Sequence, residues 1–566
     1  MNLYKEVSKS IISKLKEIPE LKDIISTEFL NNITVEIPKV RDFGDFSTNI
    51  AMMLTKKLGK KPRDIADILT PYLQQISNVE SVSVAGPGFI NIKLKDSYIK
   101  DTALSDNLEP DTGTKQKIDL DYGGYNVGKN LHIGHLRTTV VGDTFNRIAK
   151  FLGHTTKAYN HMGDWGKPMG LIIAWVLENG MPNNVDDVNR MYPASYARAK
   201  EDPAWLEKAQ KITVELQNGN EEYKKIYDTF MPMSLGQVSK LLTRLNILPF
   251  DENKGERLIA EYVPEVQEIL DTKGIIEHSD GAEIISVKQD TDTEPMPPVM
   301  WKSSAGAQTY AAADLTAIYY REKTDNPDAI VYFTDNRQTL HFKQIFRAAR
   351  LAGFADGIEL QHIGFGTITG ADGKPFKTRD GNVPSLDEMI NIVADSVRTR
   401  VKESGKDLPD ETIEMIALAA LKFNDLMHDV KSDYIFDVDS VTSFEGRTGP
   451  YILYTAVRLN SILKKVGNVS ASANCELLPE ERDLLMFLLD FNRVTETAFE
   501  KRAPYILANY AYDLCKLINT FYHTCPIMRD DIPEDIKTQR LAIVKQSLKV
   551  LSQSIELMGL KIPEEM

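Results

Sequence analysis

The chain has 566 residues, of which 42% are hydrophobic, and a formal net charge of −14 at pH 7. This length is enough for about three or four folding units. No run of 18 apolar residues occurs, and residues 1–16 lack the apolar core of a signal peptide, so we expect a cytoplasmic protein that does not span a membrane. Three cysteines, Cys475, Cys515 and Cys525, are too few and wrongly spaced for a disulfide framework or a zinc site.

Residues 1–108 are predicted to form a small α+β unit. Helical periodicity over 3–15 precedes strand-like runs at 32–37 and 82–94, and a Gly-Pro-Gly turn breaks the second run. The unit also contains a dense basic cluster, which comprises Lys56, Lys57, Lys60, Lys61 and Arg63. Phosphate binding needs local positive charge rather than a positive total, but a solvated helix end explains the cluster about equally well.

From residue 118 onward, short apolar runs alternate with helical patterns. Strands are expected at 118–121, 156–160, 298–302, 329–334 and 359–364, and helices are expected to begin near 132, 167, 310 and 340. This alternation predicts a parallel sheet that binds ligands at the carboxyl ends of its strands. Charged, helix-rich sequence over about 179–294 interrupts the rhythm and is interpreted as an insertion.

After about residue 409, every periodic segment is helical. The clearest stripe has spacings of three and four residues and consists of Leu541, Val544, Leu548, Leu551, Ile555 and Met558. Such a stripe is typical of the core of a helical bundle. We therefore divide the chain at 1–108, 109–365, 366–408 and 409–566, with the insertion inside the second region.

The most informative motif is His132-Ile133-Gly134-His135, which follows a strand and begins a helix. A helix N-terminus beside a strand end favours phosphate, because its N–H groups are unpaired and the helix dipole is positive there. Gly134 would let a planar base lie against the backbone. His132 and His135 would face one α-phosphate and stabilise the charge that develops in nucleotidyl transfer. The alternative is two polar surface histidines at a helix start.

In order and spacing, several further motifs together make the chain resemble the arginyl-tRNA synthetases, a class I family. They are Gly44 to Asn49, Gly86 to Asn91, Asn126 to Arg137, His161 to Gly166, Tyr310 to Asp314, Gln338 to Gln344, Thr448 to Tyr451 and Tyr512 to Tyr522. The resemblance covers essentially the whole chain. It implies a multidomain α/β protein in which a Rossmann-type catalytic domain lies between an N-terminal α+β domain and a C-terminal all-α bundle.

The resemblance also implies which residues bind arginine. Asp121 and Asp314 would hold the substrate side chain, since carboxylates match the fork of guanidinium donors in bidentate fashion. Tyr310 would pack on the guanidinium plane, Gln338 would line the pocket, and Asn126 and Gln344 would bind polar ends of the substrate. For each aspartate taken singly, a helix cap or a surface charge is the alternative.

A second set of residues would bind ATP. The family's Lys-Met-Ser-Lys-Ser loop corresponds here to residues 374–378, in which Pro375 and Phe376 replace the middle pair. The resemblance assigns the pyrophosphate to Lys374, Lys377 and Lys129, and Arg379 follows in the same loop. An ordinary basic surface turn is the alternative for this pentapeptide. We expect Mg²⁺ to accompany ATP rather than to occupy a dedicated protein metal site.

The implied reaction forms arginyl-adenylate and then transfers arginine to its tRNA, which must be bound before the adenylate forms. The N-terminal domain would contact the tRNA elbow, and the C-terminal bundle would contact the anticodon loop. Aromatic platforms suit unstacked bases, and those indicated by the resemblance are Tyr451, Tyr454 and Tyr522, although buried bundle tyrosines are equally compatible. A monomer is expected. Two alternatives are a nucleotidyltransferase or ligase acting on a small molecule and a tRNA-binding paralogue without catalytic activity.

Overall fold

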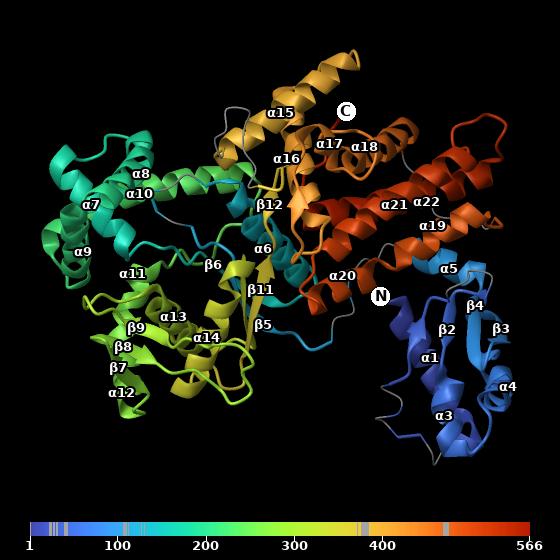
Figure 1. The fold of residues 1–566 in the computed structure, drawn as a ribbon. Coiled ribbons are helices and arrows are strands. Elements are labelled where there is room, and N and C mark those ends of the chain that lie inside the picture. The colour runs from blue at the N-terminus through green and yellow to red at the C-terminus, as the bar shows by residue number, and fades with distance from the viewer. Residues whose placement is uncertain are drawn as a thin grey trace. The chain divides into compact units, whose positions relative to one another are not determined.

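The computed structural model describes residues 2–21, 25–26, 29, 32–38, 43–105, 110, 113–125, 127–128, 131–370, 372–374, 384–467 and 475–566. The chain forms two compact units, which are described separately (Figure 1). The first unit comprises residues 1–112, 454–497 and 509–554, and the second comprises 113–453, 498–508 and 555–566.

The N-terminal part of the first unit is an antiparallel sheet with the strand order β1-β2-β4-β3 and accompanying helices. The elements are α1 (Leu3–Glu17), β1 (Val35–Glu36), β2 (Phe46–Thr48), α3 (Ile50–Leu58), α4 (Pro62–Leu73), β3 (Val79–Ala85), β4 (Phe89–Leu94) and α5 (Asp96–Ala103). The Asn2 side chain caps α1 by accepting from the backbone N–H groups of Tyr4 and Lys5. The run predicted at 82–94 is a hairpin of two strands, because the Gly-Pro-Gly segment turns the chain back.

A parallel sheet with the strand order β11-β10-β5-β6 lies at the centre of the second unit, as predicted. Its strands are β5 (Lys117–Asp121), β6 (Thr155–Tyr159), β10 (Ala329–Asp335) and β11 (Glu359–Phe365). The helices of this core are α6 (Ile133–Phe151), α7 (Lys167–Asn179), α13 (Tyr310–Thr324) and α14 (Thr339–Ala352). Parallel pairing aligns Asp121 with Tyr332, so the ends of β5 and β10 meet at the same edge.

The prediction that 298–302 belongs to the parallel sheet is wrong. This segment is β9 (Val299–Lys302), and it pairs antiparallel with β8 (Ala282–Ile285), which pairs with β7 (Ile276–Ser279) in a separate sheet. A short apolar run indicates a buried strand but not the sheet to which it belongs. The insertion is mostly helical, as predicted, and contains α8 (Val185–Glu201), α9 (Pro203–Gln217), α10 (Glu221–Arg244), α11 (Glu256–Ile259) and α12 (Val263–Thr272).

The remainder of the chain is predominantly helical. Its elements are β12 (Ile368–Thr369), α15 (Leu386–Glu403), α16 (Asp410–Leu426), β13 (Tyr434–Ile435), α17 (Val438–Val441), α18 (Gly449–Val466), α19 (Pro479–Leu489), α20 (Phe491–Glu500), α21 (Tyr505–Thr524) and α22 (Glu534–Leu557). The strand β13, which pairs in parallel with β12, is an exception to the prediction that every periodic segment after 409 is helical. Five of the six stripe residues are buried, which confirms the packing face of α22, and Leu548 is partly buried.

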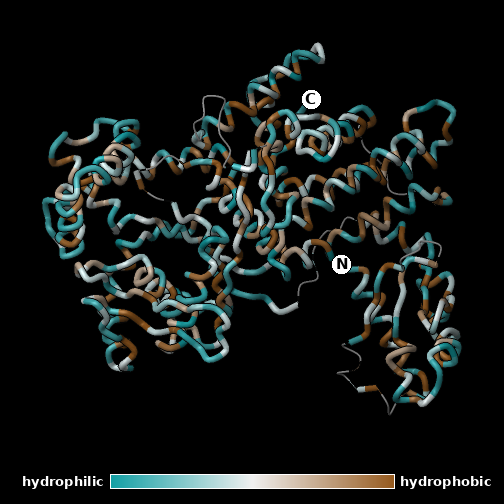
Figure 2. Tube along the Cα trace, in the orientation of Figure 1, coloured by the Kyte–Doolittle hydropathy of each residue, from teal (hydrophilic) through white to brown (hydrophobic). Residues whose placement is uncertain are grey.

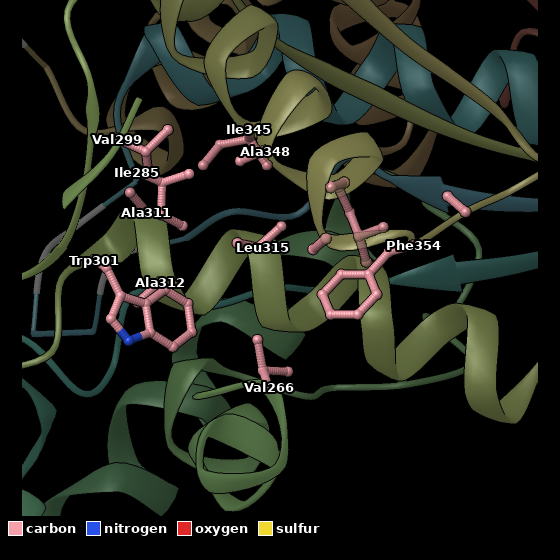
Figure 3. Packing of buried hydrophobic residues seen from close by; sticks show 14 of the residues in the cluster. Val266, Ile285, Val299, Trp301, Ala311, Ala312, Leu315, Ile345, Ala348 and Phe354 are labelled. Carbon is pink, nitrogen blue, oxygen red and sulfur yellow. The ribbon is translucent and has the colours of Figure 1, made fainter. Parts of the chain in front are cut away.

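A hydrophobic cluster fixes the helix that carries several predicted site residues. Ala311, Ala312 and Leu315 of α13 are buried together with Trp301 of β9 and Ile345 of α14 (Figure 3). Residues 310, 314 and 321 share the opposite face of α13, and this face carries polar side chains. Figure 2 shows hydrophobic and hydrophilic residues interspersed along the helices. Within the described ranges, no helix is long and apolar enough to cross a membrane.

Candidate functional site

The two motif histidines form a reciprocal cap at the start of α6. His132 is the N-cap residue, and its Nδ1 accepts from the backbone N–H of Gly134 at 3.1 Å. Nδ1 of His135 accepts from the backbone N–H of His132, also at 3.1 Å, and the ring centroids lie 4.1 Å apart. A neutral imidazole that accepts at Nδ1 carries its proton at Nε2, so each ring presents an Nε2–H donor. The prediction that a helix begins near 132 is confirmed, with His132 as the N-cap residue of α6.

Gly134 has a packing role in addition to the predicted one toward adenine. A Cβ at this position would lie 2.8 Å from Cε1 of His132, so a side chain here would displace the capping ring. Gly142, two turns further along α6, has no room for a side chain either, because a Cβ would lie 2.3 Å from Tyr122. The close approach of α6 to the segment after β5 places the histidines at the carboxyl edge of the sheet.

Of the predicted ATP and loop residues, the structure describes His132, Gly134, His135 and Lys374. Lys374 is exposed, and its backbone closes a turn by accepting from the N–H of Gly370 at 2.8 Å and donating to Asp372 at 3.0 Å. Asn126, Lys129, Lys377 and Arg379 lie outside the described residues. Their assignments remain predictions.

Asp314 lies at the centre of a polar cluster on α13. Its Oδ2 accepts from Nε2 of His341 at 2.6 Å, and its Oδ1 lies 3.5 Å from Nε2 of His161. Tyr310, one turn earlier, is 66% exposed, and its ring centroid lies 5.0 Å from that of His341. The structure thus brings together two predicted arginine-binding residues, and it adds two histidines from the quoted motifs 161–166 and 338–344 that had no individual role in the sequence analysis.

Glu256 is a further acidic residue at this site that sequence reasoning missed. Its backbone N–H donates to Met162, and its Oε2 accepts from the N–H of Trp165 at 3.3 Å. Burial, reinforced by the negative charges of Asp164 and Asp314, raises the pKa of Glu256 to about 8. The insertion offers many acidic residues, and no spacing in the sequence distinguishes this one.

A buried carboxylate holds Glu256 in place. Asp164 is 3% exposed, and it accepts from the hydroxyl of Tyr227 at 2.8 Å and from the backbone N–H of Arg257 at 3.1 Å. Gly255 is required beside it, because a Cβ there would lie 2.4 Å from Oδ2 of Asp164. Helix α10 of the insertion, which carries Tyr227, therefore contributes to the architecture of the acidic cluster.

The structure gives Asp121 a partner that the sequence analysis did not expect. Its Oδ2 accepts from Nη2 of Arg321 at 2.6 Å, and both side chains are buried. Asp119 faces the same guanidinium, and burial raises its pKa to about 7 against the opposing charge of Arg321. Arg321 therefore occupies one of the two carboxylate oxygens of Asp121, and the predicted role of Asp121 toward the substrate stays a prediction.

Replacing Arg321 by methionine is expected to destabilise the second unit by about 3–5 kcal/mol, because two buried carboxylates lose their cation. The pKa of Asp119 already lies above its unfolded value, so its contribution to stability falls as the pH rises from about 4 to about 7. In the variant the pKa of Asp119 should rise further, so this decline should continue to higher pH, and the loss should be smaller at pH 5 than at pH 8. Urea unfolding at both pH values tests this, with Arg321→Lys as the charge-retaining control. Equal losses at the two pH values would contradict the assignment.

The two glutamines of the predicted pocket differ in their environments. Gln338 is exposed at the N-cap of α14. Gln344 donates through Nε2 to the carbonyl of Pro297 at 2.6 Å, so its amide nitrogen supports the segment before β9. Its predicted contact with substrate would have to use the remaining carbonyl oxygen.

A cavity of about 660 Å³ opens beside the acidic cluster. It is lined by Glu256, Tyr310 and Trp165, together with residues of α9 and of the segment 303–309. This is large enough for an amino-acid side chain, since small-molecule sites begin at about 300 Å³. A carboxylate, an exposed tyrosine and an indole at one cavity suit a planar cation.

The predicted tRNA-binding residues lie on the surface or at its edge. The four lysines at positions 56, 57, 60 and 61 are exposed, and Lys57 lies 5.0 Å from the ring centroid of Phe29. Tyr454 and Tyr522 flank Arg458, whose guanidinium lies 4.7 Å and 5.3 Å from their ring centroids. Tyr522 is 39% exposed, and Tyr451 is partly buried on α18. Stacked aromatic and guanidinium groups are suitable platforms for unpaired bases.

A parallel-sheet core with His-x-Gly-His at its carboxyl edge defines the catalytic domain of a class I aminoacyl-tRNA synthetase. The family described as "tRNA synthetases class I (R), catalytic domain" matches residues 99–438. The family "Arginyl tRNA synthetase N terminal domain" matches 5–94, and "DALR anticodon binding domain" matches 452–566. The chain belongs to the arginyl-tRNA synthetase family.

Similar proteins agree along nearly the whole chain. An arginine–tRNA ligase of Agathobacter rectalis is 36% identical over 93% of this chain and 94% of its own length. One from Shewanella amazonensis is 34% identical over 99% of this chain and 100% of its own. The arginyl-tRNA synthetase structure of Thermus thermophilus covers both chains completely with a TM-score of 0.82 at 23% identity, which shows the shared fold.

These findings confirm the resemblance, the multidomain α/β fold and the reaction. The enzyme uses ATP to attach L-arginine to its tRNA through an arginyl-adenylate, and it releases AMP and pyrophosphate. ATP, arginine and tRNA are therefore its ligands.

Proposed function

We propose that the guanidinium group of arginine binds between Asp314 and Glu256, with Tyr310 against its plane. The single observation that carries this proposal is the cavity, which is lined by Glu256 and Tyr310. Asp314 follows Tyr310 by one turn of α13. Two carboxylates that converge on one cation supply the bidentate acceptors that the substrate needs. We propose that Asp121 contributes at the opposite end of arginine, where Oδ1 would receive the α-ammonium group while Arg321 fixes Oδ2. Asn126, Gln338 and Gln344 remain proposed arginine ligands.

The proposed ATP site comprises the α6 cap and the lysine loop. Nε2–H groups of His132 and His135 would donate to the α-phosphate, and Lys374, with Lys377, Arg379 and Lys129, would neutralise the pyrophosphate. The arginine carboxylate attacks the α-phosphate in line, so these groups chiefly position the reactants and stabilise charge. We propose that Mg²⁺ arrives bound to ATP. Among the described residues, no group of three His, Cys, Asp or Glu side chains is arranged to hold a metal.

For tRNA, we propose that residues 1–108 contact the elbow through the lysine cluster at 56–61 and that 409–566 contact the anticodon loop through Tyr451, Tyr454 and Tyr522. Region 109–365 would carry out catalysis, and 366–408 would carry the lysine loop and contact the tRNA stem. We further propose a cytoplasmic monomer.

Arginine-dependent ATP–pyrophosphate exchange, with and without arginine tRNA, tests the proposed sites. Exchange should occur with arginine and not with lysine, citrulline or cysteine, because only a guanidinium fills both carboxylate positions. Citrulline is the sharpest control, since it keeps the shape and loses the charge. Equal exchange with citrulline would contradict a carboxylate-lined pocket.

Glu256 should make arginine binding depend on pH. Its pKa of about 8 means that it is largely protonated at pH 7, and a bound guanidinium favours the ionised form. The KM for arginine should therefore fall about tenfold between pH 6.5 and 8.5 as the carboxyl ionises. Measuring exchange across this range tests the prediction, and Glu256→Gln should flatten the profile. A flat profile in the unmodified enzyme would exclude Glu256 from the guanidinium site.

A further inference from the structure

We propose that Arg137 is a positioning residue for ATP, which holds the segment that carries Lys374 against the first turns of α6. This rests on the proposed role of Lys374 toward the pyrophosphate. Arg137 follows His135 by two residues, so it belongs to the same helical segment as the capping histidines. Its side chain is 1% exposed, and it therefore acts through other residues rather than on substrate.

The guanidinium of Arg137 joins two separate backbone segments. Nη1 donates to the carbonyl of Gly366 at 2.9 Å and to that of Ser432 at 2.8 Å. Nε lies 2.9 Å from Oδ1 of Asp425, which balances the charge. Gly366 directly follows β11 and leads toward Lys374, so one contact fixes the start of this segment.

The segment after Gly366 is tightly paired at the point where Arg137 fastens it. Gly366 donates through its N–H to Val430 at 3.0 Å, and β12 pairs in parallel with β13 two residues later. A Cβ on Gly366 would lie 2.5 Å from the backbone of Ser432, so the two chains can approach only because this residue is glycine. If Arg137 only needed its charge balanced, the contact with Asp425 would be enough. Its guanidinium also donates to the carbonyls of Gly366 and Ser432, and so it joins the two paired backbone segments.

The chain returns to the same end of α6 after the lysine loop. The N–H of Leu386 donates to the carbonyl of Leu131 at 2.7 Å, and Ser385 forms a β-bridge with His132. Residues on both sides of the loop are thus bonded to α6 or to the residues that precede it. Arg137 makes the contact on the Lys374 side.

The test uses the full-length enzyme and arginine tRNA. Arg137→Lys keeps the charge beside Asp425 but loses the fork that reaches two carbonyls. It should raise the KM for ATP in pyrophosphate exchange by about tenfold and leave the KM for arginine within about twofold, because only the ATP-binding segment shifts. Gly366→Ala pushes the backbone of residue 366 away from Ser432 without changing Arg137. It should likewise raise the KM for ATP and leave the KM for arginine nearly unchanged.

A matched control is Arg540→Lys in the first compact unit. Nε of Arg540 lies 2.8 Å from Oε1 of Glu481, Nη1 donates to the carbonyl of Pro526 at 2.7 Å, and both charged side chains are buried. This variant should lower the melting temperature without changing the KM for ATP at saturating tRNA. If Arg137→Lys and Arg540→Lys both raise the KM for ATP and the KM for arginine to a similar extent, the effect is a general loss of folding and the proposal is overturned.

Lys374→Met separates this inference from the proposed ATP site. If it raises the KM for ATP while Arg137→Lys and Gly366→Ala do not, the positioning role of Arg137 is overturned and the role of Lys374 stands. If Lys374→Met leaves that KM unchanged, the proposed function of Lys374 fails, and the inference that rests on it fails too.

Discussion

Asp314→Asn is expected to lower kcat/KM for arginine by about 10²- to 10³-fold, because removing one partner of a desolvated charge pair typically costs about 2–5 kcal/mol. The change keeps the shape of the side chain and removes its charge. The oxygen that remains in the asparagine amide can still accept from Nε2 of His341, now 2.6 Å from Oδ2, so the variant chiefly tests the loss of charge. Most of the effect should be in the KM for arginine, measured by exchange at saturating ATP and tRNA.

Asp292→Asn is a suitable control for this variant. Its carboxylate is also paired within the protein, with both oxygens accepting from Arg347 at 2.7 Å, and its side chain is 4% exposed. Losing this pair should affect stability and leave arginine affinity unchanged. A normal KM for arginine in Asp314→Asn, together with a raised KM for ATP, would move Asp314 out of the guanidinium site.

The central sheet could be predicted because its four strands are short apolar runs between helical patterns, which is a local signal. The position of β9 could not be predicted in the same way. Val299 and Trp301 are buried in the antiparallel sheet, and a short apolar run of this kind is equally typical of a strand in a parallel sheet. The choice depends on pairing with β8, some 14 residues earlier, and periodicity does not encode which strands pair.

At the site, residues within compact motifs could be predicted, and residues placed by distant contacts could not. Tyr310 and Asp314 are one helical turn apart, so their shared face follows from sequence spacing. Glu256 is positioned by Met162 and Trp165, about 90 residues away, and its altered pKa exists only in the folded chain. The partner of Asp121 is equally non-local, because Arg321 follows it by 200 residues.

The two ring nitrogens of His135 have different functions at the start of α6. Nδ1 of His135 stabilises the helix start, and Nε2–H is the proposed donor to the α-phosphate. Asparagine places its amide near the Nδ1 position, and glutamine places its amide near Nε2. His135→Asn should therefore keep the cap and lower kcat for adenylate formation by about 10²- to 10³-fold, as expected when a preorganised donor to a developing charge is removed.

His135→Gln should keep the donor that His135→Asn loses. It should retain at least tenfold more exchange activity than His135→Asn, and its stability should stay close to that of the unmodified enzyme, because glutamine at the third position of a helix can also accept from the N–H of the N-cap residue. Exchange rates at saturating ATP, arginine and tRNA distinguish the two variants, and melting temperatures check that both keep the cap. If His135→Asn is as active as the unmodified enzyme and His135→Gln is inactive, the imidazole serves to shape the start of α6. The phosphate donor must then be sought in the backbone N–H groups of that turn, which the same cap holds in place.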